Sequence, residues 1–204
     1  MIWDKVSWIY DIMEIFNRKT NKGIEIAVAR EIPKGARVLD CAAGTGMLSM
    51  AAAEKAKHIT CTDLSKNMLI NAMQKARKRG IHNISFAKRD ITALKDKTET
   101  YDVVMAGNVL HLLDDPAQAF SELLRVTKKG GKLIIPTYLL GETNIIWKFI
   151  IDIYNMLGIG FKSKFTINDY MDFIAENAEK AGCAEYSTEY IYGTLPAGFA
   201  VIKK

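Results

Sequence analysis

The chain has 204 residues, 49% of them hydrophobic and 25% charged, and a formal net charge of +5 at pH 7. This length favours a single domain with additions, and the apolar fraction is sufficient for a sizeable core. The mild positive charge does not by itself indicate a nucleic-acid partner. The three cysteines are scattered and lack metal-ligand spacing, which predicts a reduced intracellular chain and no metal site.

Neither of two stretches has the pattern of an export or membrane signal. The opening residues lack the basic-then-apolar order of a signal peptide. The most apolar run, 145–161, is interrupted by Lys148, Asp152 and Asn155, so it is a poor membrane span. We therefore expect a cytoplasmic protein without stable membrane insertion.

From residue 36 onward, short apolar runs alternate with longer amphipathic ones, which is typical of a mostly parallel sheet covered by helices. In chain order we expect a strand ending at Val38-Leu39, a helix over 46–56, a strand over 59–62, a helix from Ser65 to Gly80, strands at 84–86 and 101–106, a helix capped by Asp115 and ended by Gly130-Gly131, and a strand over 132–136. The ligand crevice of such a doubly wound unit lies at the carboxyl ends of its strands.

The last third of the chain has a different pattern. Thr166, followed three residues later by Asp169, resembles a capping box ahead of a helix that stops at Gly182. Residues 185–192 and 199–202 are rich in β-forming residues and predict an antiparallel hairpin that closes the sheet.

A basic cluster, Lys75 to Arg79, ends the helix that Ser65 opens. It is open to interpretation as an RNA-binding patch. Cations also suit the negative end of a helix dipole, and we prefer this simpler explanation.

The segment Val38 to Ser49 reads VLDCAAGTGMLS, a strand end followed by a glycine turn and a helix. A nicotinamide-dinucleotide site requires three glycines, whereas Gly44 and Gly46 supply two and Ser49 stands at the third position. Asp63, at the tip of the second strand, suits the ribose of any adenosine-containing ligand. Asp40 would repel a pyrophosphate but attract an α-ammonium group. The pattern therefore predicts a ligand with ribose at one end and an amino-acid cation at the other.

Asp40-x-Ala42-x-Gly44-x-Gly46 resembles the first motif of the class I S-adenosylmethionine-dependent methyltransferases, D/E-x-G-x-G-x-G. The likeness continues at 62–69, 89–91, 101–113 and 124–133, in the order typical of that family. The resemblance implies an α/β, Rossmann-like, doubly wound and mostly parallel seven-stranded sheet with a C-terminal antiparallel hairpin. It implies S-adenosyl-L-methionine as the cofactor. We divide the single domain, 1–204, into an N-terminal helical cap (1–35), a cofactor-binding core (36–137), a helical lid or insert (138–182) and the hairpin (183–204).

Carried onto the matching positions, the resemblance implies cofactor contacts at Tyr10, Asp40, Ala42, Gly44, Gly46, Asp63, Leu64, Met68, Asp90, Ile91 and Asn108. Asp63 would accept hydrogen bonds from the ribose hydroxyls, although it would also serve as a helix cap beside Ser65. Asp90 would meet the adenine amino group, with a cap or surface acid as the alternative. His111 is the candidate general base because an imidazole has a pKa near neutrality, and the alternative is a packed residue.

Ala42 departs from the family motif, which has glycine at this position. An alanine with negative φ would cost little, whereas a positive φ would weaken binding or move the loop. We expect the alanine to be tolerated because Gly44 and Gly46 remain where the backbone comes closest to the ligand.

The function predicted is methyl transfer to a small, apolar or aromatic molecule by direct in-line displacement, loosely as in the ubiquinone/menaquinone-biosynthesis C-methyltransferases. Residues 3–16 and 145–157 would cover the site, although the second segment is equally consistent with plain core. An amine or phospholipid-headgroup N-methyltransferase is one alternative, and a non-catalytic S-adenosylmethionine-binding protein is another. No nucleic-acid partner is expected, and the oligomeric state is left open.

Overall fold

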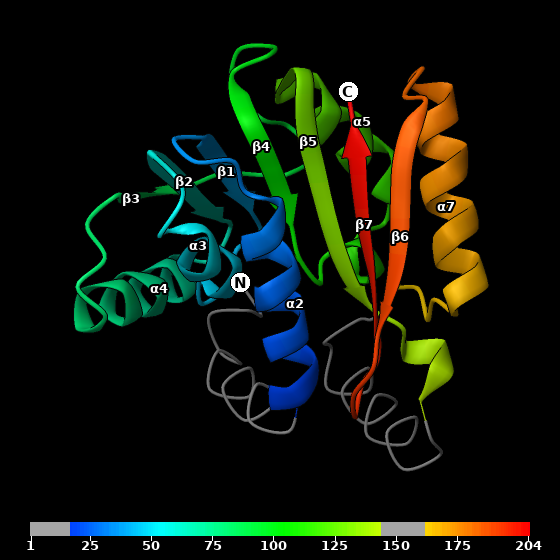
Figure 1. Cartoon of the computed structure of the whole chain (residues 1–204), viewed down its shortest axis with the longest axis horizontal. Coiled ribbons are helices and arrows are strands. Elements are labelled where there is room, and N and C mark those ends of the chain that lie inside the picture. Colours follow the sequence, from blue (N-terminus) through cyan, green and yellow to red (C-terminus); the bar gives the residue numbers. More distant parts are fainter. Residues whose placement is uncertain (1–16, 144–161) are drawn as a thin grey trace.

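The computed structural model describes residues 17–143 and 162–204, which are arranged around one mixed sheet (Figure 1). The strands are β1 (Arg37–Cys41), β2 (His58–Asp63), β3 (Ile84–Lys88), β4 (Tyr101–Ala106), β5 (Thr127–Tyr138), β6 (Glu185–Ile191) and β7 (Ala197–Lys203). Their order in the 7-stranded sheet is β3-β2-β1-β4-β5-β7-β6. All neighbouring pairs are parallel except β5 with β7 and β6 with β7. The predicted fold class is confirmed.

Helices cover both faces of this sheet. They are α2 (Arg18–Glu31), α3 (Met47–Ala52), α4 (Lys66–Lys78), α5 (Pro116–Val126) and α7 (Ile167–Lys180), with short 3-10 turns η1 (Leu110–Leu112) and η2 (Leu140–Glu142). The hydrophobic clusters place α2 and α3 on one face and α5 and α7 on the other. The strand order reverses between β1 and β4, so the ligand crevice is expected at the carboxyl ends of these two strands.

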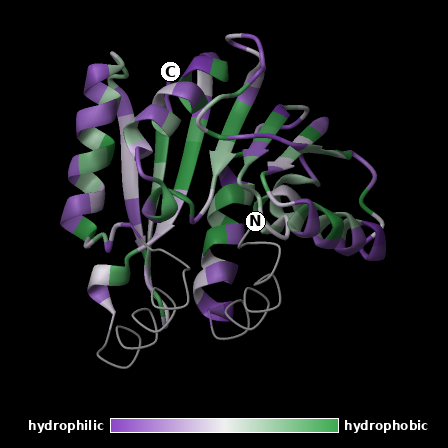
Figure 2. Cartoon of the chain, turned by 180° about the vertical axis from the view of Figure 1, so that it is seen from behind, coloured by the Kyte–Doolittle hydropathy of each residue, from purple (hydrophilic) through white to green (hydrophobic). Residues whose placement is uncertain are grey.

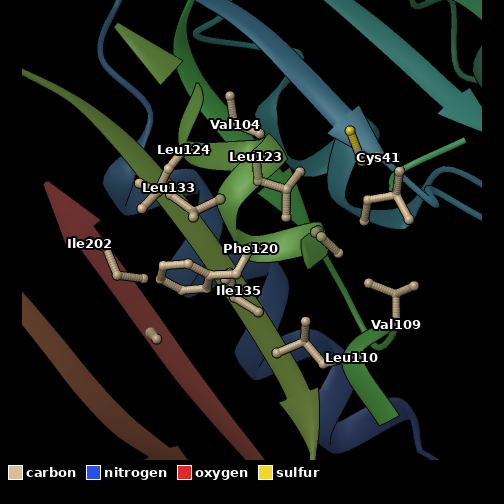
Figure 3. Packing of buried hydrophobic residues seen from close by; sticks show 14 of the residues in the cluster. Cys41, Val104, Val109, Leu110, Phe120, Leu123, Leu124, Leu133, Ile135 and Ile202 are labelled. Carbon is tan, nitrogen blue, oxygen red and sulfur yellow. The ribbon is translucent and has the colours of Figure 1, made fainter. Parts of the chain in front are cut away.

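The central strands are buried on both faces. Val38 and Val103 pack with the α2 and α3 cluster, whereas the adjacent residues Leu39 and Val104 pack with the α5 and α7 cluster. Side chains alternate between faces along a strand, so covering both faces requires nearly continuous apolar sequence. Figure 2 shows this as green central strands between helices with purple outer turns. Figure 3 shows Phe120 of α5 packed among Leu133, Ile135 and other residues of the second cluster.

The helix starts that the sequence predicts are confirmed. The Ser65 hydroxyl accepts a hydrogen bond from the Met68 amide at 3.3 Å, and the Asp115 carboxylate accepts one from the Gln118 amide at 2.9 Å. Thr166 and Asp169 form a reciprocal capping box at the start of α7. These caps act within one turn, so each is readable from local sequence.

Two predicted helix ends are wrong. Helix α3 ends at Ala52 instead of residue 56, and the side-chain amide of Asn83 donates to the carbonyls of Ala53 and Ala56 at 2.9 Å. Helix α5 ends at Val126, and β5 begins at Thr127, before the Gly130-Gly131 pair that was expected to stop the helix. A Cβ on Gly131 would lie 2.8 Å from the Asp102 carbonyl oxygen, so this glycine permits close approach of strand β4.

No helix in the described ranges is long and apolar enough to cross a membrane. The proposed cover segments, 3–16 and 145–157, fall outside residues 17–143 and 162–204. The predicted cytoplasmic location stays a prediction.

A contact between α7 and β7 fixes the C-terminal side of the sheet. Tyr170 of α7 is fully buried, and its hydroxyl donates to the Ile135 carbonyl of β5. The ring lies against Gly198 of β7, where a Cβ would come within 2.4 Å of two ring carbons. A ring that is hydrogen-bonded and closely packed on all sides cannot move aside for an added methyl group.

Gly198→Ala should therefore lower the free energy of unfolding by about 2 kcal/mol or more. Urea denaturation of the full chain measures this loss. Ser187→Ala, on the exposed strand β6, is the matched control and should change stability by less than about 0.5 kcal/mol. Equal midpoints for the two variants would contradict this account of the packing.

Candidate functional site

A loop of five residues, 42–46, leaves the end of β1 and enters α3. Ala42, Gly44 and Gly46 all have left-handed backbone, with φ of 49°, 54° and 83°. The Ala43 amide donates to the Thr62 carbonyl of β2 at 2.9 Å, and the Gly46 amide donates to the Ala43 carbonyl at 2.8 Å. The loop is thus anchored to the neighbouring strand. A Cβ on Gly44 would meet no atom within 4 Å, so the space beside that residue is open to a ligand.

Ala42 has the positive φ that would make an alanine costly. The expectation that its methyl group is readily tolerated is therefore corrected, since left-handed backbone costs a non-glycine residue about 1 kcal/mol or more. The loop keeps the path of a glycine-rich motif at the expense of strain at this position.

Asp63, at the end of β2, is bonded to both segments that flank the crevice. Its Oδ2 accepts a hydrogen bond from the Gly44 amide at 2.9 Å, and its Oδ1 accepts one from the Ser65 amide at 2.8 Å. The contact with the Ser65 amide is the local capping role that the sequence offered as the alternative, and the ribose role of Asp63 stays a prediction. A carboxylate only accepts hydrogen bonds and each of its oxygens has two lone pairs, which is the chemistry that ribose hydroxyls require.

Two cavities adjoin the loop and share Ala42, Gly44 and Asn108. The larger, about 220 Å³, is lined by Ala42, Gly44, Asp63, Leu64, Met68, Arg89, Ile91, Asn108, Val109, Leu112 and Leu113. The smaller, about 50 Å³, is lined by Asn21, Asp40, Ala42, Ala43, Gly44, Thr45, Met47, Leu48, Gly107, Asn108 and Tyr138. The structure thus brings together most of the predicted cofactor residues, with Asp63 at the larger cavity and Asp40 at the smaller one.

Asp40 lines the smaller cavity and is 0% exposed. Its Oδ2 accepts a hydrogen bond from the Ser49 hydroxyl at 2.6 Å, and its Oδ1 has no hydrogen-bond partner among residues 17–143 and 162–204. Burial raises the pKa of this carboxyl to about 7, against the opposing effect of the Ser49 hydrogen bond. A buried carboxylate oxygen without a donor is costly, and a cationic N–H group would remove that cost.

Three polar residues on this side were not found from the sequence. Ser49 is the residue that replaces the third glycine of the dinucleotide pattern, and it holds Asp40. Asn21 of α2 accepts a hydrogen bond from the hydroxyl of Tyr138 at the end of β5. Asn21 lies on the buried face of α2. A polar residue on this face was the sequence feature that could have indicated its role.

Asn108 connects the two cavities. It has a left-handed backbone with φ of 53°, its amide donates to the Pro136 carbonyl at 2.8 Å, and its side-chain oxygen accepts from the Tyr138 amide at 3.0 Å. Its side chain is thereby held against the end of β5 while the residue still borders both cavities.

The predicted adenine contacts are placed unequally. Leu64, Met68 and Ile91 line the larger cavity. Asp90 is exposed and is not among the residues that line it, and its Oδ1 accepts hydrogen bonds from the Thr92 amide and hydroxyl. This is the local turn contact expected of a surface acid. Tyr10 lies outside the described residues.

His111 does not have the pKa near neutrality that made it a candidate base. Its side chain is 2% exposed, and burial lowers its pKa to about 4. It lines neither of the two cavities described above. Its carbonyl accepts hydrogen bonds from the Lys162 and Ser163 amides at 2.7 and 3.2 Å, so the residue fastens the start of the segment that leads to α7.

Comparison with known proteins identifies the family. A family model described as methyltransferase domain matches residues 32–148. The chain belongs to this methyltransferase family. The ubiquinone/menaquinone biosynthesis C-methyltransferase UbiE of Bdellovibrio bacteriovorus is 36% identical over 113 residues, which are 54% of this chain and 47% of that protein. The demethylmenaquinone methyltransferase of Renibacterium salmoninarum is 33% identical over 128 residues, 63% of this chain and 52% of that protein.

The chain thus spans about half the length of these two curated relatives. Among solved structures, a SAM-dependent methyltransferase from Aquifex aeolicus superposes with a TM-score of 0.65 at 19% identity, covering 90% of this chain and 89% of that one. This likeness concerns the fold. The predictions of the class I methyltransferase family and of S-adenosylmethionine as the cofactor are confirmed.

The residues of the site fit this cofactor. The orphaned Oδ1 of Asp40 suits an ammonium group, and the acceptor oxygens of Asp63 suit ribose hydroxyls. The apolar side chains between them, Leu64 and Ile91 among others, suit a purine. Together they would hold the two ends and the ring of one molecule.

Ala42→Gly should stabilise the methyltransferase by about 1 kcal/mol, because glycine removes the strain of a left-handed alanine. The free energy of unfolding in urea measures this gain. Ala43→Gly is the control, because Ala43 is next in the chain but does not have a positive φ, and it should lower stability. An Ala42→Gly variant no more stable than Ala43→Gly would show that position 42 is unstrained.

Affinity for S-adenosylmethionine should rise with pH through about 7. A cationic ligand favours the ionised form of Asp40, and the free protein holds a proton on that carboxyl below its raised pKa. Titration calorimetry at pH about 6 and about 8 should show roughly tenfold tighter binding at the higher pH. Asp40→Asn should bind more weakly and lose this dependence, whereas Asp90→Asn should keep it. A flat profile in the unmodified protein would rule out Asp40 as the titrating group.

Proposed function

We propose that this protein transfers the methyl group of S-adenosylmethionine to a small, apolar or aromatic acceptor by direct in-line displacement. The observation that carries the proposal is the pair of carboxylates beside the Gly44 loop. Asp40 is buried, with one oxygen that has no partner among the described residues, and Asp63 lines the larger, mostly apolar cavity. The two curated relatives, named for quinone biosynthesis, favour an acceptor with an aromatic or quinonoid ring.

The chain's own residues act by positioning. The cofactor, when bound, supplies an already activated methyl group, so no covalent intermediate with the protein is required. Asp40 would hold the ammonium end and Asp63 the ribose, and the hydrogen bonds of Asn108 to β5 fix the wall where the two cavities meet. Holding two reactants in line accounts for much of the rate in such reactions.

A general base is not assigned. His111 is buried and neutral at physiological pH, with its pKa lowered to about 4. A base of that strength contributes little near neutral pH. An acceptor that needs no deprotonation by this residue, such as an already acidic ring carbon or hydroxyl, is consistent with the site.

The transfer assay separates this proposal from a cofactor-binding protein without activity. Label from methyl-labelled S-adenosylmethionine should enter aromatic or quinonoid acceptors. Label in amine or phospholipid-headgroup acceptors alone would favour the N-methyltransferase alternative. Cofactor binding without transfer to any of these would overturn the proposed activity while leaving the site intact.

Asp63→Ala should weaken binding of S-adenosylhomocysteine by about 1–3 kcal/mol, because hydrogen bonds to the ribose and to the Gly44 amide are lost together. Asp63→Asn retains one acceptor oxygen and should lie between this variant and the unmodified protein. Asp172→Ala, an exposed acid on α7, is the charge-matched control and should bind normally. Unchanged affinity in Asp63→Ala would refute the ribose assignment.

A further inference from the structure

A third and larger groove lies between α2 and α4, beside the glycine loop and bordered by Met47 and Met50 of α3. It has a volume of about 510 Å³ and is lined by Arg18, Asn21, Lys22, Glu25, Thr45, Met47, Met50, Lys75 and Arg79. Figure 1 shows α3 between the two longer helices. The cations that line the groove form two pairs, Arg18 with Lys22 and Lys75 with Arg79. The members of each pair are four residues apart, so they lie on the same side of their helix.

The groove has an excess of positive charge. Four cationic side chains line it against one carboxylate, Glu25, and that carboxylate is 3.3 Å from Lys22 Nζ. Within residues 17–143 and 162–204, Arg18 and Arg79 have no carboxylate partner. Arg30, Arg89 and Arg125 each form an ion pair, whereas Arg37 and Arg77 have none with the described residues and do not line the groove.

Helix-end electrostatics does not account for this arrangement. It explains Lys75 and Arg79 at the end of α4, but Arg18 is the first residue of α2, where no acidic residue occupies the first turn. A cation at the positive end of a helix dipole is destabilising. An anion in the groove would offset that cost and would also interact with the cations of α4.

The groove is continuous with the cofactor side. Asn21, Thr45 and Met47 line both the groove and the 50 Å³ cavity that contains Asp40. Lys75 Nζ donates to the Thr45 hydroxyl at 2.9 Å, which links the basic pair of α4 to the loop residue next to Gly44. A ligand in the groove would therefore lie beside the loop without occupying the cavity lined by Asp63.

We propose that this groove binds a phosphate-bearing small molecule, with phosphate oxygens held by Arg18 and Arg79 and further charge supplied by Lys22 and Lys75. The planar guanidinium forms bidentate hydrogen bonds with two phosphate oxygens, which favours a phosphate as the ligand. The volume exceeds that needed by one phosphate, so the ligand has a second phosphate or an organic part. A soluble phosphate ester and the headgroup of an anionic lipid share this chemistry. The proposal goes beyond methyl transfer and does not require it.

Titration calorimetry of the full chain with inorganic pyrophosphate, at fixed ionic strength and without cofactor, tests the site. Saturable binding is expected, and Arg18→Gln with Arg79→Gln should weaken it by about tenfold or more. Arg77→Gln with Lys78→Gln is the matched control, because it removes the same charge from exposed residues near the end of α4 that do not line the groove. Thermal unfolding of both double variants checks that each is folded.

The outcomes separate the sources of phosphate and the competing explanations. Binding to pyrophosphate supports a soluble ligand. Binding only to vesicles containing phosphatidic acid, again lost in the Arg18 and Arg79 variant alone, supports a lipid headgroup. If both double variants lose the same affinity, binding depends on overall positive charge and not on the groove, and the proposal is overturned. Competition by S-adenosylhomocysteine would also overturn it, because the groove would then belong to the cofactor site. If neither pyrophosphate nor the vesicles bind, the proposal is likewise overturned.

Discussion

A carboxyl group with no exposed surface at the end of β1 is the constraint on which the site depends. Asp40 is held on one side by the Ser49 hydroxyl, and its other oxygen has no donor in the part of the chain that the structure describes. Burying such a group destabilises the charged form, and the raised pKa of about 7 expresses that cost. A cationic ligand removes this cost. The unfavourable burial of the ionised Asp40 carboxyl therefore favours binding of a cation.

The loop between Ala42 and Gly46 places this carboxyl beside the rest of the crevice. Three left-handed residues bring the backbone round so that the Gly44 amide meets Asp63 of the next strand. Gly44 lines both cavities, so this hydrogen bond lies where the smaller cavity meets the larger one. Strain at Ala42 is therefore the local consequence of a backbone path that the ligand site requires.

Local sequence predicted those features whose partners lie nearby in the chain. The caps at Ser65, Asp115 and Thr166 act over three residues, and the strand-end acids Asp40 and Asp63 flank a short glycine motif. The features that sequence did not reveal depend on distant partners. Asn83 bonds to the carbonyls of Ala53 and Ala56 just beyond the end of α3, and Asn21 meets Tyr138 from 117 positions away. The pKa of His111 depends on burial by the whole fold. The groove between α2 and α4 depends on two helices that are far apart in the sequence.

The central claim is that the cofactor binds with its cationic end at a carboxyl that is partly protonated in the free protein. Proton release on binding of S-adenosylmethionine at pH about 7 tests it most directly, through the dependence of calorimetric heat on the ionisation enthalpy of the buffer. The unmodified protein should release about half a proton per cofactor bound, and Asp40→Asn should release none. Equal proton release by the two proteins would contradict the account.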